Sequence, residues 1–142
     1  MKVKIRRIDK SVLLPAYLTG GASALDLYVR EKIIVEPKKI ALIPLNVAIK
    51  LPRGHFGLLA ARSSLPKRGL FIANGLGIFD EDFAGNNDEY KAFVYNFTDQ
   101  PVVVEKGDRI VQLIILPHDR VEWEETDDLG SNDRGGIGTT GK

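Results

Sequence analysis

A period of two in the hydrophobic pattern between residues 41 and 51 restricts the folds open to this chain. Apolar side chains occupy every second position of that stretch: Ala41, Ile43, Leu45, Val47, Ile49 and Leu51. Successive side chains of a β-strand point to opposite faces of the sheet, so this pattern is typical of a strand with one buried face. The alternation predicts one long strand over residues 41–51.

Other segments also favour strands. Residues with high β-propensity are concentrated in three of them: Lys91–Phe97, Pro101–Val104 and Ile110–Leu116. Turn signals recur at short intervals, at Gly20-Gly21, Pro37-Lys38-Lys39, Pro52-Arg53-Gly54, Thr98-Asp99-Gln100 and Lys106-Gly107-Asp108. The sole helix candidate runs from Ser64 to Arg68, and Pro66 limits it to a turn or two. The sequence therefore predicts an all-β sandwich or jelly roll with one short helix.

The length and the change in composition near the end predict the domain organisation. The 142 residues suffice for one domain around a single core, which we assign to residues 1–126. From about Asp127 onward the chain is rich in Gly, Ser, Asn, Asp and Thr, which predicts a flexible C-terminal arm over residues 127–142.

Charge and composition exclude several function classes. Lys and Arg total 20 and Asp and Glu total 19, so the net charge of +1 does not favour extensive nucleic-acid binding. Without cysteine there is no disulfide framework or thiolate metal site, and His55 and His118 are too few for a usual zinc site. The sequence has neither an apolar run of membrane-spanning length nor the apolar region of a secretion signal, so we expect a soluble, cytoplasmic protein.

An acidic segment is the first candidate for chemistry. Asp80, Glu81 and Asp82 are consecutive, and Gly77 and Gly85 bound their segment, which predicts a tight strand-to-turn hairpin. A carboxylate in such a turn can hold and deprotonate a water if nearby cations keep it ionised. Acidic turns are more often solvated loops, and composition alone does not choose among the three carboxylates.

Polar residues elsewhere suit phosphate. Arg62, Ser63 and Ser64 combine a planar guanidinium fork with two hydroxyl groups, although three such residues can also be a surface strand end. Gln112 lies in an apolar strand, and is either an edge residue facing solvent or a polar group entering a site. Asp26 lies between two leucines and is likewise either a residue facing solvent or a polar group entering a site.

The glycine-rich tail is another phosphate candidate. Residues 136–142 satisfy the G-x-x-x-x-G-K part of a P-loop, but no Ser/Thr and helix follow Lys142, so a true P-loop is not expected. Backbone amides of the tail, together with Arg134, could instead wrap a polyphosphate. The alternative is a disordered tail.

Five segments, in this order along the chain, resemble the five motifs of the trimeric dUTPase family (deoxyuridine triphosphate nucleotidohydrolases): Ala24–Leu27, Arg62–Ser64, Gly77–Gly85, Gly107–Gln112 and Arg134–Gly141. The resemblance runs from about Val3 to Lys142. It implies a β jelly roll that assembles as a homotrimer with active sites built from several subunits. It also implies hydrolysis of dUTP to dUMP and pyrophosphate with Mg²⁺ bound by the triphosphate, which limits uracil in DNA and supplies dUMP for dTMP synthesis.

The family register implies a role for each candidate residue. Asp80 would orient the water that attacks the α-phosphorus, and Asp26 would contact Mg²⁺ indirectly, through water. The phosphate-binding residues would be Arg62, Ser63, Ser64, Gln112, Arg134, Gly136, Gly138 and Thr139. The residues binding uracil and deoxyribose would be Asn74, Gly77, Phe83 and Ile137.

The chain also departs from the family pattern. Ala24 replaces a glycine, Phe83 a tyrosine, and Ile137 a phenylalanine that covers the uracil. The arm is shorter between Arg134 and Ile137, and residues 86–88 resemble a short insertion.

Two alternative functions share this fold. A dCTP deaminase would need a glutamate on the strand after the acidic segment, where this chain has the apolar Phe93-Val94-Tyr95. A trimer that binds nucleotide without catalysis is the second alternative, and the altered arm favours it.

Overall fold

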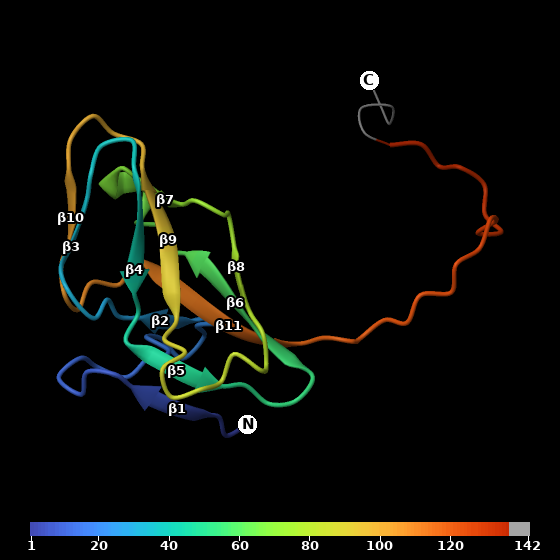
Figure 1. Cartoon of the computed structure of the whole chain (residues 1–142), viewed down its shortest axis with the longest axis horizontal. Coiled ribbons are helices and arrows are strands. Elements are labelled where there is room, and N and C mark those ends of the chain that lie inside the picture. Colours follow the sequence, from blue (N-terminus) through green and yellow to red (C-terminus); the bar gives the residue numbers. More distant parts are fainter. Residues whose placement is uncertain (137–142) are drawn as a thin grey trace.

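The computed structural model describes residues 1–136, which form a β-rich body followed by an extended C-terminal segment (Figure 1). The strands are β1 Lys4–Arg7, β2 Leu25–Leu27, β3 Ile33–Val35, β4 Ile40–Pro44, β5 Val47–Lys50, β6 His55–Ala61, β7 Leu70–Ile72, β8 Gly77–Phe79, β9 Lys91–Asn96, β10 Val102–Val104 and β11 Val111–Pro117. The helix found in the described residues is one 3₁₀ turn, η1 Pro66–Arg68. The predicted all-β fold with one short helix is therefore confirmed.

The prediction of a single strand over residues 41–51 is wrong, although its buried face is confirmed. The apolar residues from Ile43 to Leu51 at alternating positions are 0–4% exposed. The chain is divided between β4, which pairs with β9, and β5, which pairs with β1. Asn46 makes the corner with φ of 67°, in the left-handed region that asparagine tolerates. Its side chain accepts the Asp9 N–H at 2.7 Å and donates to the Asp9 carbonyl at 3.0 Å, which fixes the corner.

The strands predicted from β-propensity are confirmed as β9, β10 and β11, with slightly different ends. β11 lies at the centre of a four-stranded sheet with the order β2-β11-β6-β8. Its antiparallel ladder with β6 runs from the pair Val111–Ala61 to the pair Pro117–His55. Figure 1 shows β6 and β11 as long strands reaching the point where the C-terminal segment leaves the body.

One face of this sheet is apolar and packs into the core, while the other is mixed. The buried face carries residues that are at most 1% exposed: Leu27, Leu59, Val111 and Leu113. On the opposite face Gln112 lies directly between Asp26 of β2 and Ala60 of β6. Because side chains alternate along a strand, the register that buries the apolar set places Gln112 and Asp26 together outside the core.

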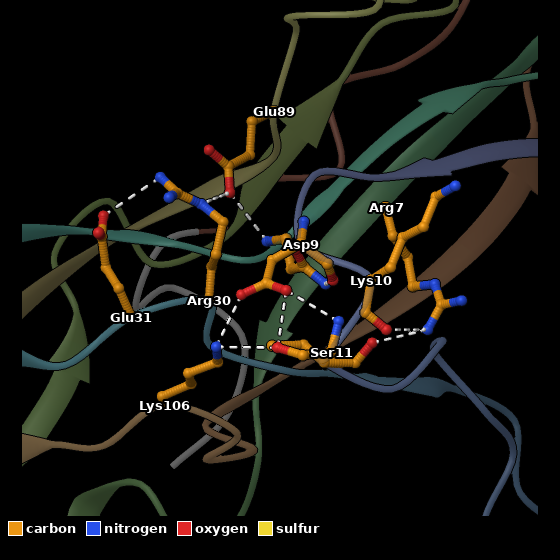
Figure 2. Close-up of polar contacts among 10 residues, drawn as sticks. Arg7, Asp9, Lys10, Ser11, Arg30, Glu31, Glu89 and Lys106 are labelled. Carbon is orange, nitrogen blue, oxygen red and sulfur yellow. Dashed lines mark hydrogen bonds and ion pairs between the residues drawn. The ribbon is translucent and has the colours of Figure 1, made fainter.

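A polar cluster ties the N-terminal turn to the body (Figure 2). The Asp9 carboxylate accepts hydrogen bonds from Lys106 Nζ and Ser11 Oγ, both at 2.7 Å, and these hold the pKa of Asp9 well below its ordinary value. Arg30 Nε donates to Glu89 at 2.8 Å, which raises the pKa of Arg30. Since the pKa of Asp9 is lowered, this carboxylate stabilises the fold above its ordinary pKa and loses that effect as the pH falls through the lowered value.

Residues 118–136 form no helix or strand, and those up to residue 135 are exposed. The predicted domain boundary at residue 127 falls within this segment. In the described part of the chain, no helix is long and apolar enough to cross a membrane.

Tyr90 is buried at the edge of the acidic segment. Its ring stacks on that of Phe79 with a centroid distance of 3.7 Å and an interplanar angle of 7°. Its hydroxyl is buried without a hydrogen-bond partner among residues 1–136, and burial raises the pKa of Tyr90. A buried hydroxyl that lacks a partner lowers the stability of the fold.

We expect Tyr90→Phe to stabilise the protein by about 1 kcal/mol, because it removes the desolvated hydroxyl and keeps the stack. The wild type should lose stability above about pH 10, where unfolded tyrosine ionises but buried Tyr90 does not, and the variant should lose less. Urea unfolding at neutral and alkaline pH measures both effects. Tyr17→Phe is the control, since Tyr17 is 60% exposed. A less stable Tyr90→Phe variant would contradict the expectation.

Candidate active site

The first group of predicted site residues lines a hollow at one end of the β6–β11 ladder. We call it the Asp26 hollow; its lining is Leu18, Thr19, Ala22, Ser23, Ala24, Asp26, Arg62, Ser63 and Gln112. Asp26 comes from β2, Gln112 from β11, and Arg62 follows the last residue of β6. Three strands therefore converge there, and the structure brings together four residues that the sequence analysis had selected.

The carboxylate of Asp26 in the hollow lies between two arginines, of which Arg62 lines the hollow. Asp26 Oδ2 lies 3.1 Å from Arg62 Nε and 3.3 Å from Arg109 Nη1, so one carboxylate faces two guanidinium groups. Arg62 Nη1 also donates to the Arg109 carbonyl at 2.9 Å. Gln112 Nε2 donates to the Ala61 carbonyl at 3.0 Å, which fixes the direction of its amide. With Arg109, the local cluster of charges carries two guanidinium groups for one carboxylate, and guanidinium groups are good donors to phosphate oxygens.

Arg109 was missed by the sequence analysis as a site residue. It belongs to the Gly107–Gln112 segment, and a cation close before Gln112 was the available signal. Ser64 is exposed and lies outside the lining of the Asp26 hollow.

The second group lies at the other end of the ladder, in a hollow that we call the acidic hollow. Its lining is Asp80, Glu81, Asp82, His118 and Arg120. Asp80 directly follows β8 and its carbonyl accepts the Phe83 N–H at 3.2 Å, which closes a turn. The predicted strand and turn are confirmed, but the hairpin is wrong: among the described residues β8 pairs with β6 and with no following strand. A short strand can pair there because β6 offers the edge beside Gly57–Leu59.

The two hollows of one chain are well separated. Phe79, next to Asp80, lies opposite Gly57 of β6. Arg62 is five residues beyond Gly57, which corresponds to roughly 16 Å along an extended strand. A single chain therefore does not place Asp80 beside the guanidinium of Arg62.

The residues predicted to bind uracil and deoxyribose are distributed around β8. Asn74 is exposed in the turn before this strand, and Gly77 is its first residue. A Cβ on Gly77 would lie 3.1 Å from the side chain of Leu59, so only glycine fits there without displacement of its neighbour. Phe83 is 37% exposed. Its ring stacks on those of Phe79 and Tyr90, with a centroid distance of 6.1 Å to each.

The predicted arm residues fall at and beyond the end of the described chain. Arg134 is exposed and Gly136 half-buried, in the extended segment that Figure 1 shows away from the body. Ile137, Gly138 and Thr139 lie outside the described residues.

The fold is that of an all-β protein with polar hollows at both ends of its central strand ladder. A family model described as dUTPase matches residues 10–141, and the chain belongs to the dUTPase family. It is 37% identical over 145 residues to the deoxyuridine 5'-triphosphate nucleotidohydrolase of Hydrogenobaculum sp. (strain Y04AAS1), with 99% of each chain covered.

Solved dUTPases have the same architecture. That of Streptococcus mutans is 31% identical, with a TM-score of 0.76 over 84% of this chain and 98% of that chain. The dUTPase of Staphylococcus bacteriophage 80alpha with dUPNHPP is 23% identical, with a TM-score of 0.85 over 99% of this chain and 98% of that chain, a likeness in fold. These neighbours are jelly rolls, so the predicted jelly roll is confirmed.

We expect Asp26→Ala to lower the free energy of unfolding by about 1–2 kcal/mol, because it leaves two neighbouring guanidinium groups without their shared carboxylate. Added salt should reduce this loss by screening the repulsion. Asp99→Ala is a matched control: the Asp99 side chain is 87% exposed and pairs with Lys38 at 3.3 Å. Urea unfolding measures both variants, and equal losses would show that Asp26 has no special electrostatic role.

Proposed function

We propose that this protein hydrolyses dUTP to dUMP and pyrophosphate. The observation that carries this proposal is the Asp26 hollow, in a chain that belongs to the dUTPase family. A triphosphate is a polyanion, and the hollow offers the Arg62 guanidinium, hydroxyl groups and an oriented amide to its oxygens.

Phosphoryl transfer depends mainly on positioning and charge neutralisation. In our proposal Arg62, Ser63 and Gln112 bind phosphate oxygens, with Ser64 and the arm residues completing the set. Asp80 orients a water and accepts its proton as the water oxygen bonds to the α-phosphorus. The bond from the α-phosphorus to its bridging oxygen breaks, and pyrophosphate leaves with that electron pair. Phe83 stacks on the deoxyribose and leaves no room for a 2′-hydroxyl.

Mg²⁺ is the proposed cofactor, brought by the triphosphate. No group of three or more His, Cys, Asp or Glu residues that could hold a metal ion exists within residues 1–136. Mg²⁺ prefers oxygen ligands and retains several waters, so phosphate oxygens suffice to hold it. Asp26 engages the arginines through Oδ2, which leaves its other oxygen to contact the hydration shell of the ion. Bound there, Mg²⁺ would neutralise charge on the phosphates.

We further propose that each site combines residues of different copies in a homotrimer. Asp80 has to act on the phosphate chain that Arg62 binds, yet Gly57, which lies opposite the residue before Asp80, is already roughly 16 Å from Arg62 along β6. The outer sheet face between them carries apolar residues: Leu58, Ile78 and Ile114, of which Ile78 is 58% exposed. A neighbouring copy that covered this face would bring the two hollows together, and closed cyclic symmetry would complete three such sites.

The C-terminal segment supports the same assembly. Val121, Trp123 and Leu129 are between 70% and 88% exposed, which is unusual for large apolar side chains unless a neighbour covers them. In our proposal residues 127–142 form the arm of the predicted domain organisation and close a neighbouring site. Arg134 would then contact the γ-phosphate, and Asn74, Gly77 and Ile137 would surround the uracil.

The test is pyrophosphate release from dUTP, dCTP, dTTP and UTP compared side by side, with Asp80→Asn as the variant. We expect turnover of dUTP in preference to the others. Asp80→Asn should lower kcat by about 10²–10⁴-fold, the usual contribution of one positioned base. Binding of a non-hydrolysable dUTP analogue should remain, because Asp80 acts on the water.

Asp82→Asn is the control, because its carboxylate lies in the same acidic hollow. A larger loss of kcat in this control, or near-normal turnover by Asp80→Asn, would assign the base to another residue. Binding of dUTP without release of pyrophosphate would indicate a nucleotide-binding protein instead of an enzyme, and formation of dUTP from dCTP would indicate a deaminase.

A further inference from the structure

Glu81 differs from its two acidic neighbours in its contacts. Its Oε2 accepts a hydrogen bond from the Gly54 N–H at 2.6 Å and is half-buried. The carboxylates of Asp80 and Asp82 have no hydrogen bond or ion pair within the described part of the chain, and both residues are exposed. The turn therefore separates one engaged carboxylate from two that remain available to a ligand.

Gly54 joins the acidic turn to the end of β11. While its N–H donates to Glu81, its carbonyl accepts the His118 N–H at 2.9 Å. Its φ is +72°, in the left-handed region that glycine adopts without strain. The ring of His118 packs edge-on against that of Phe56, the residue after His55, with a centroid distance of 5.9 Å. This contact keeps the strand end in place. One residue, Gly54, thus connects the acidic turn to the first residue of the extended C-terminal segment.

We propose that Glu81 is a positioning residue that holds Asp80 in its working orientation through the hydrogen bond to Gly54. The inference rests on the proposed function, in which Asp80 is the base. With no side-chain partner among the described residues, Asp80 depends on the backbone of the turn for its direction. A charge-assisted bond from the adjacent residue to a backbone N–H restricts that backbone.

Catalysis is sensitive to such restriction. A displacement of about 1 Å in a positioned group can cost 10²-fold in rate. The Glu81–Gly54 bond also fixes the turn relative to His118, where the C-terminal segment starts. The acidic turn and the start of the C-terminal segment are therefore both hydrogen-bonded to Gly54.

Three variants of the full chain separate the effect of side-chain length at Glu81 from the effect of its charge. Glu81→Ala removes the acceptor, Glu81→Asp keeps the charge but shortens the side chain, and Glu81→Gln keeps an acceptor of the same length without the charge. We expect Ala and Asp to lower kcat by about 10- to 100-fold. The KM for dUTP and the Kd for a non-hydrolysable analogue should stay within about threefold, since the lost interaction acts on the base. The Glu81→Gln variant should retain most of the wild-type kcat.

Asp119→Ala is the matched control, because it removes one negative charge from an exposed residue beside His118. Its kcat should equal that of the wild type. Should Glu81→Ala fail to fold, the milder Glu81→Asp variant carries the test.

Several results would overturn the inference. These are an unchanged kcat in Glu81→Ala and Glu81→Asp, an equal loss in all three variants, or a lowered Tm with normal kcat for the folded enzyme. Asp80→Asn, assayed in parallel, keeps the two proposals apart. If Asp80→Asn is inactive and the Glu81 variants are normal, only the positioning role fails. If Asp80→Asn turns over normally, the assignment of Asp80 as the base fails.

Discussion

The antiparallel ladder between β6 and β11 determines where the two hollows lie. Its register buries Leu59, Val111 and Leu113 on one face and leaves Gln112 on the other. A slip of one residue would turn Gln112 into the core, so the burial of the apolar side chains also specifies the site. The same ladder places the Asp26 hollow at one end and the acidic hollow at the other.

The two ends of the ladder have opposite electrostatic character, and in our proposal this is why one binds phosphate and the other orients the attacking water. At one end the Asp26 carboxylate is shared by Arg62 and Arg109, and the remaining positive charge suits a triphosphate. At the other end Glu81 accepts a hydrogen bond from Gly54, and in our proposal this orients Asp80 toward the substrate. In our proposal hydrolysis needs both ends at one phosphate chain. Assembly of several copies would satisfy this requirement without any change in the ladder.

Local pattern predicted much of the fold, and motif register predicted part of the site. Alternation identified the buried residues from Ile43 to Leu51, but the corner at Asn46 depends on hydrogen bonds to Asp9, far away in sequence. The motifs selected residues that line the Asp26 hollow. The sequence predicted neither the contact of Arg109 with Asp26 nor the bond between Glu81 and Gly54. Such contacts follow from strand register and turn geometry, which a sequence pattern does not contain.

In the proposed assembly, Asp80 and the Asp26 hollow of one working site belong to different copies of the chain. Mixing Asp80→Asn chains with Arg62→Ala chains tests it most directly, since Arg109 still pairs with Asp26 in the second variant. After the two are unfolded and refolded together, native mass spectrometry verifies the hybrids and pyrophosphate release from dUTP is measured. We expect the hybrids to have activity well above the sum of the two separate variants. Hybrids no more active than that sum would contradict it.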